Sequence, residues 1–192
     1  DVRKYPSSRA MYLDGSNIPE SVYDNLIKVV HENMDLMYRY VRLRKKSLGV
    51  EELHMYDIYA PIAKAPSKKY SFEEAKTIVK EGLAPMGEEY LSKLQEGFDN
   101  RWIDVYENEG KRSGAYSWGA YGTHPYVLLN FQGTLDHVFT LAHEMGHALH
   151  SYYSDANQTY INAGYKIFVA EVASTCNESL LIHDLLKKTK DK

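Results

Sequence analysis

The segment 134–154 constrains the fold more than any other part of the sequence, because its residues divide by type between the two sides of an α-helix. At about 100° per residue, one side gathers the apolar residues Leu135, Val138, Leu141, Ala142, Met145, Leu149 and Tyr152. The opposite side gathers Asp136, Thr140, His143, Glu144, His147, His150 and Ser151. We therefore predict a helix that packs its apolar side on a core and turns its polar side toward a site.

The polar side of this helix carries a metal-ligand pattern, His143-Glu144-Met145-Gly146-His147. A spacing of four residues places both imidazoles on one face, one turn apart, where they can bind one Zn²⁺ ion. Glu144 lies between them and can accept a proton from the water that such an ion activates. A solvated surface stripe would carry similar residues, but three ligand-type side chains coinciding with this motif favour a zincin-type metal site.

A catalytic zinc ion takes three protein ligands and leaves its fourth position to water. The metzincin pattern is excluded, because His150 and Tyr153 stand where it requires Gly and His. Glu171 is the favoured third ligand, since an acidic residue in an apolar run of small residues needs a partner. Glu178 is the alternative ligand. If the two helices pack antiparallel, it falls nearer the start of the first helix and suits a hydrogen bond to a ligating imidazole.

The remaining sequence predicts a mainly α fold with one small β-sheet or hairpin. Apolar residues recur at helical spacing from Pro19 until Gly49, and Ser71-Phe72-Glu73-Glu74 matches a capping box that opens another helix. The further expected elements are an interruption over 82–87, a helix over 88–98, strands within 113–119 and 125–131, and a helix over 165–187. We expect one domain over 1–192, with a helical part (1–110), a strand pair (111–133) and two zinc-site helices (134–187).

Charge and cysteine content narrow the function classes. A net charge of −3 gives no electrostatic reason to bind nucleic acid or an anionic membrane surface. No uncharged apolar run approaches the roughly 18 residues that span a bilayer. The single cysteine, Cys176, excludes an internal disulfide and favours a reducing, cytoplasmic location. It lies off the face that carries Glu171, so we predict a core position for it.

Several segments together resemble the oligoendopeptidase F branch of the thimet-oligopeptidase family of zinc metallopeptidases. The resembling segments are 111–119, 124–126 with 130–131, 141–151, and 168–175 with 177–178, with further similarity at 54–57 and 102–106. The resemblance implies a zincin-type catalytic region that hydrolyses short peptides in a deep channel between helical lobes. Short peptides are then the expected partners, and one Zn²⁺ ion per chain is the expected cofactor.

The resemblance also implies roles for individual residues. The implied ligands are His143, His147 and Glu171, with Glu144 as general base and Glu178 as a supporting residue. The strand at Gly114-Ala115-Tyr116 would pair with the substrate backbone, which its small residues and edge-like composition allow. His150 could line the cleft, form a local hydrogen bond or have no role.

Members of this family are much longer than 192 residues, and a His- and Tyr-containing segment beyond the zinc helices stabilises the oxyanion. We therefore expect an internal fragment whose partners include the remaining lobes of a parent enzyme, and which is weakly active or inactive alone. Two alternatives stay open. A zinc carboxypeptidase would need a cationic group for the substrate carboxylate. A zinc- or peptide-binding fragment without turnover would have no use for Glu144, since structural zinc sites are closed by four protein ligands.

Overall fold

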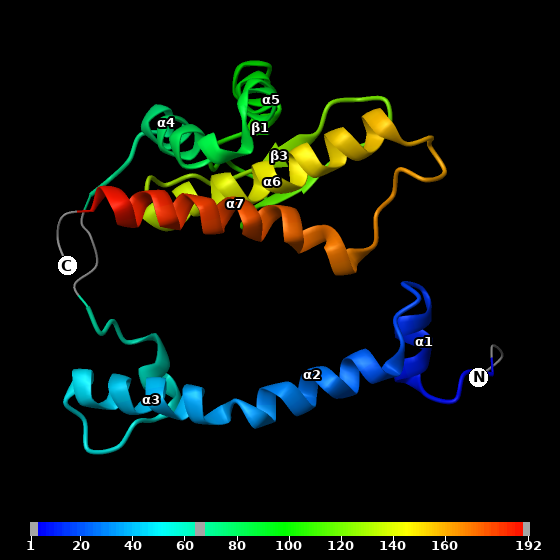
Figure 1. Cartoon of the computed structure of the whole chain (residues 1–192). Helices are drawn as coiled ribbons and strands as arrows, with labels where there is room; N and C mark the ends of the chain where they lie inside the picture. Colours follow the sequence, from blue (N-terminus) through cyan, green and yellow to red (C-terminus); the bar gives the residue numbers. More distant parts are fainter. Residues whose placement is uncertain (1–3, 64–67, 190–192) are drawn as a thin grey trace. The chain divides into compact units, whose positions relative to one another are not determined.

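The computed structural model describes residues 4–63 and 68–189 and divides the chain into two units, 1–67 and 68–192 (Figure 1). The boundary between the two units falls within residues 1–110, which the sequence analysis treats as one helical part. No helix in the two described ranges is long and apolar enough to cross a membrane. All candidate site residues belong to the second unit.

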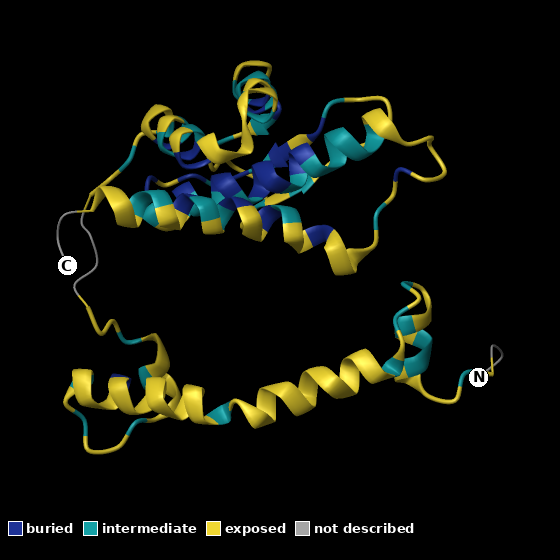
Figure 2. Cartoon of the chain, viewed as in Figure 1, coloured by how far each residue is buried: buried dark blue, intermediate teal, exposed yellow. Residues whose placement is uncertain are grey.

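The first unit consists of helices that are largely exposed (Figure 2). Its elements are α1 (Ser8–Asp14), α2 (Glu20–Glu32), α3 (Met34–Leu48) and the 3₁₀ helix η1 (Met55–Tyr59). The helix predicted from Pro19 to Gly49 is divided at Asn33, whose side chain donates a hydrogen bond to the Val29 carbonyl at 2.8 Å. An Asn side chain that bonds the backbone competes with the helix, which accounts for the break. Gly49 ends α3, as predicted, and adopts the left-handed conformation.

The second unit begins with two short helices, α4 (Phe72–Gly82) and α5 (Glu88–Asp99). The predicted capping box is confirmed: the Ser71 hydroxyl accepts from the Glu74 amide at 3.2 Å, and Glu74 Oε2 accepts from the Ser71 amide at 2.7 Å. The interruption between the helices is a short 3₁₀ turn, η2 (Ala84–Met86), followed by Gly87 with a positive φ of 87°. Only glycine adopts such a conformation without strain.

A three-stranded sheet follows, with the strand order β1-β3-β2. Its strands are β1 (Ile103–Asp104), β2 (Tyr116–Trp118) and β3 (Tyr126–Leu128). The predicted strand pair is confirmed, because β2 and β3 run antiparallel with Ser117 opposite Val127. β1 pairs in parallel with β3 and was not predicted, since two residues are too few to show a strand period. The order leaves β2 at one edge of the sheet.

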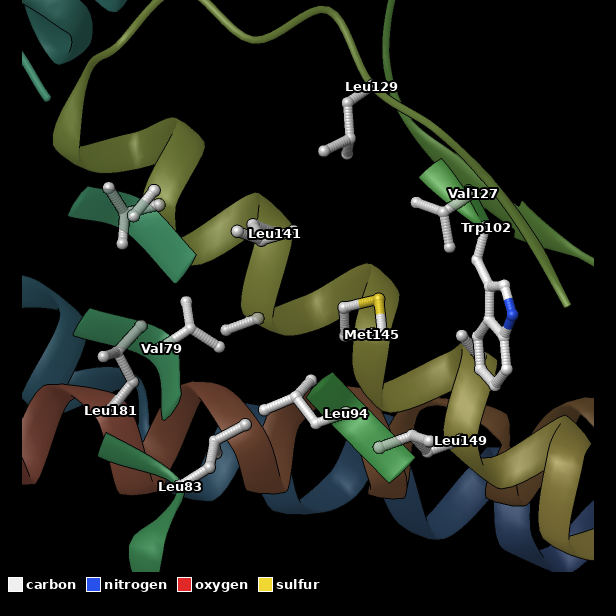
Figure 3. Packing of buried hydrophobic residues seen from close by; sticks show 14 of the residues in the cluster. Val79, Leu83, Leu94, Trp102, Val127, Leu129, Leu141, Met145, Leu149 and Leu181 are labelled. Atoms are coloured by element: carbon white, nitrogen blue, oxygen red, sulfur yellow. The ribbon is translucent and has the colours of Figure 1, made fainter. Parts of the chain in front are cut away.

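Two long helices, α6 (Leu135–Asn157) and α7 (Ile167–Lys188), complete the unit and lie side by side (Figure 1). α6 is central, because it contacts α4, α5, α7 and both β2 and β3. The side predicted to be apolar forms the core, where Leu141, Met145 and Leu149 pack with residues of the other elements (Figure 3). The fully buried members of this side also include Val138 and Ala142. This packing leaves the polar side of α6 for the candidate site.

α6 and α7 lie close together at Gly146. A Cβ atom added at Gly146 would lie 2.7 Å from Ser174 Cα and 2.9 Å from the Ala173 carbonyl oxygen. Four residues earlier on α6, the Ala142 carbonyl accepts a hydrogen bond from Asn177 on α7 at 3.0 Å. Residue numbers therefore fall along α6 as they rise along α7, so the two helices pack antiparallel.

Gly146→Ala should destabilise the second unit by about 1–3 kcal/mol, because the new methyl group meets rigid backbone atoms of α7. Urea unfolding followed by tryptophan fluorescence measures this directly, since both tryptophans lie in the second unit. Gly164→Ala is the matched control, because no heavy atom lies within 4 Å of its added Cβ. Equal free energies of unfolding for the wild type and Gly146→Ala would contradict the close packing.

Candidate metal centre

The antiparallel packing of α6 and α7 brings His143, His147 and Glu171 together, with one ligand atom of each within 4.8 Å of the others. The two imidazole Nε2 atoms lie 3.1 Å apart, and Glu171 Oε2 lies 3.4 Å from His143 Nε2 and 3.3 Å from His147 Nε2. Zinc bonds of about 2.0–2.2 Å in a tetrahedral site place the ligand atoms about 3.3–3.6 Å apart. The spacing of these three atoms therefore fits a single metal ion.

Glu178 contacts the opposite edge of the His143 ring. Its Oε1 lies 2.5 Å from His143 Nδ1, so a proton on Nδ1 is shared with the carboxylate and Nε2 is left as an acceptor. Nε2 is the nitrogen that faces Glu171 and His147. Of the two acidic residues that the sequence left open as ligands, Glu171 therefore lies at the convergence of the imidazoles, and Glu178 is placed to orient one of them.

His147 lies in surroundings that keep its ring neutral. Burial lowers its pKa, and this effect exceeds the opposing attraction of the Glu171 carboxylate. The Ala170 backbone, on the first turn of α7, also raises this pKa, but by less than burial lowers it. Since a histidine must be unprotonated to bind a metal, the ring is in its ligand form at neutral pH.

Glu144 lies between the two histidines in sequence and is only 6% exposed. Burial raises the pKa of its carboxyl, and the nearby Glu171 carboxylate adds to this, while His143 and the backbone N–H of Ser117 on β2 act in the opposite direction. Glu144 lines a hollow of about 350 Å³, which we call the Glu144 hollow. Its other lining residues are Ala115, Asp136, Phe139, Thr140, His143 and Glu178. A buried carboxyl at the wall of an open hollow is placed to exchange protons with a bound molecule.

The segment predicted to contact substrate, Gly114-Ala115-Tyr116, reaches this hollow in part. Ala115 lines it, and Gly114 precedes β2 with a φ of 89°. Asn130 fixes this turn by donating to the Gly114 carbonyl at 2.8 Å. The Tyr116 side chain lies on the other face of the sheet from the buried Val127, so only its backbone is available on this side.

His150 lies outside the cluster of His143, His147 and Glu171. Its ring stacks on Tyr165 with 3.8 Å between ring centroids, and the Tyr165 hydroxyl shares a hydrogen bond of 2.8 Å with Ser151. These contacts join α6 to the segment that leads into α7. Cys176 is exposed, so the predicted core position was wrong. The buried side of α7 is instead formed by Ala170, Ser174, Asn177 and Leu181.

Two polar residues in the α6–α7 interface were missed by the sequence analysis. Ser174 donates a hydrogen bond to Glu171 Oε2 at 2.8 Å. Asn177 accepts from the Tyr90 hydroxyl at 3.0 Å and donates to the Ala142 carbonyl. Burial raises the pKa of Tyr90 to about 12, so its hydroxyl remains a donor at neutral pH. The only sequence signal was their spacing with Ala170 and Leu181 on one face of α7.

The model of peptidase family M3 matches residues 1–192. Oligopeptidase PepF of Bacillus subtilis is 53% identical over 190 residues, covering 99% of this chain and 28% of that protein. A crystal structure from Chlamydophila abortus is similar with a TM-score of 0.86 and 45% identity, over 98% of this chain and 32% of that one. The crystal structure of oligoendopeptidase F from Enterococcus faecium has a TM-score of 0.62 and 37% identity, over 99% and 26%. The chain thus spans less than a third of each of these relatives.

In the metal-free protein, Glu144→Gln should raise the free energy of unfolding at pH 7. The folded-state pKa of Glu144 lies above its unfolded value, so the ionised form lowers stability at neutral pH. This effect disappears as the pH falls below about 4.3, where both states are protonated. The difference in the free energy of unfolding between variant and wild type, measured by urea unfolding, should therefore shrink from pH 7 to pH 4.

The control is the exposed Glu109, whose change to Gln should alter the free energy of unfolding by no more than about 0.5 kcal/mol. A Glu144→Gln difference that is independent of pH would contradict the burial argument.

Proposed function

Because the chain belongs to peptidase family M3, we propose that it carries the zinc site of a metalloendopeptidase that hydrolyses peptide bonds in short oligopeptides. The observation that carries this proposal is the convergence of His143, His147 and Glu171 beside the buried carboxyl of Glu144. Three ligand atoms with an adjacent proton acceptor suit a catalytic zinc site, in which the fourth position is open.

In this proposal, His143 and His147 would hold one Zn²⁺ ion through their imidazoles, and Glu171 would hold it through its carboxylate. When bound there, zinc supplies Lewis acidity to the scissile carbonyl and to the attacking water. Glu144 accepts the proton of that water and delivers it to the leaving amine. Burial supports this role, because a carboxyl with a raised pKa takes and returns a proton more readily near neutral pH.

The edge strand β2 is the proposed binding surface for the peptide backbone. It is paired on one side only, with β3, so its other edge can accept an extended peptide. The Glu144 hollow continues into a second hollow of about 340 Å³, and the two share Ala115, Asp136 and Thr140. Substrate side chains next to the scissile bond would occupy this space.

The lining residues favour an endopeptidase over a carboxypeptidase. A carboxypeptidase needs a cation that binds the terminal carboxylate, and the described residues around the Glu144 hollow include no lysine or arginine. Lys111 lines the adjoining hollow, but its ammonium group is already bound by the Asp104 carboxylate at 3.2 Å and by the Tyr106 carbonyl at 2.7 Å. We therefore propose cleavage within the peptide rather than at its C-terminus.

Glu144→Gln should retain zinc while lowering peptide hydrolysis by about 10²–10⁴-fold, because the amide cannot accept the proton of the attacking water. The measurement is cleavage of an internally quenched peptide by the full-length parent enzyme, as wild type and as variant, each at a measured zinc content. Product masses locate the cleaved bond and so separate internal from C-terminal cleavage.

Three results would count against the proposal. Undiminished hydrolysis by Glu144→Gln would remove the residue from the mechanism. Cleavage restricted to the C-terminal residue would favour a carboxypeptidase. A full-length wild type that binds zinc and peptide without cleaving the peptide would favour a binding protein without turnover.

A further inference from the structure

Ser174 lies on α7 opposite Gly146 of α6. Its side chain is fully buried, and its Cα atom would lie 2.7 Å from a Cβ atom at Gly146. Although the interface requires a small residue here, it does not require a hydroxyl group, since alanine is as small. The polar atom of Ser174 is therefore not explained by packing alone.

The Ser174 hydroxyl is directed at the oxygen that faces the two histidines. It lies 2.8 Å from Glu171 Oε2 and, at the longer distance of 3.1 Å, from the Glu171 backbone carbonyl. The same Oε2 atom lies 3.4 Å from His143 Nε2 and 3.3 Å from His147 Nε2. A carboxylate oxygen has two lone pairs. With one of them occupied by the Ser174 hydroxyl, the other is left toward the imidazoles.

Glu171 needs such a contact more than the two histidines do. Its side chain is 60% exposed, and it reaches the cluster through three rotatable bonds, so a free carboxylate would occupy several rotamers. The histidines are better fixed, because they are only 28% and 16% exposed, and His143 is also held by a hydrogen bond to Glu178.

We propose that Ser174 is a positioning residue for the metal centre: its hydroxyl holds the Glu171 carboxylate in the rotamer that turns Oε2 toward His143 and His147. This inference rests on the proposed zinc site and adds to it the residue that prepares its carboxylate ligand. His143 and Glu171 then each have an orienting contact from a residue of α7.

The test compares Ser174→Ala with Thr175→Ala in the full chain. Thr175 is the matched control, because its exposed hydroxyl also bonds Glu171, but at the backbone carbonyl, at 2.5 Å. The zinc dissociation constant is measured by competition with a chelating dye, and the melting temperature is measured without metal. Absorption of the Co²⁺-substituted protein reports on the ligand geometry.

Ser174→Ala should weaken zinc binding by about 10–100-fold and change the Co²⁺ spectrum. Its metal-free melting temperature should be unchanged or slightly higher, since alanine fits the space and favours a helix. Thr175→Ala should keep the wild-type affinity and spectrum.

The inference is overturned if Ser174→Ala binds zinc as tightly as the wild type, or if both variants lose affinity equally. It is also overturned if Ser174→Ala loses affinity and metal-free stability together, because Ser174 would then only support the fold. If His147→Ala binds zinc as tightly as the wild type, the proposed zinc site is refuted, and this inference is refuted with it.

Discussion

The close antiparallel contact of α6 with α7 at Gly146 is the constraint on which the rest of the site depends. Because Gly146 has no side chain, the backbone of α7 can lie against α6. The short distance between the two helices lets Glu171 reach both histidines. Asn177 fixes the register through its bond to the Ala142 carbonyl. The apolar side of α6 is packed in the core, and this packing fixes the orientation of the polar side of the helix. The candidate ligands are thus placed by helix packing rather than by a flexible loop.

Those features that depend on one helix or on local spacing could be predicted from the sequence. The periodicity of 134–154 indicated α6 and its buried side, and the four-residue spacing placed both imidazoles on one face. The capping box at Ser71 marked the start of α4 because its two hydrogen bonds are local. Glu171 stood out because an acidic residue in an apolar run needs a partner. These signals are contained in a few consecutive residues.

Features that depend on contacts between distant segments could not be predicted in the same way. β1 is too short for a strand period and forms only because β3 is beside it. Ser174 and Asn177 are ordinary small polar residues in the sequence, and their roles follow from the residues across the interface. Cys176 was wrongly predicted to be in the core. The buried side of α7 is determined by its contacts with α6 and α4, and the sequence alone does not show where these helices lie.

X-ray absorption at the zinc edge tests most directly whether the two helices build one metal centre from two imidazoles and a carboxylate. The chain is loaded with one equivalent of zinc, and the wild type is compared with His147→Ala. For the wild type, we expect only nitrogen and oxygen ligands at about 2.0–2.2 Å and the outer-shell scattering of two imidazole rings. For His147→Ala, we expect the outer-shell scattering of one imidazole ring. A sulfur ligand at about 2.3 Å, or identical spectra for wild type and variant, would contradict it.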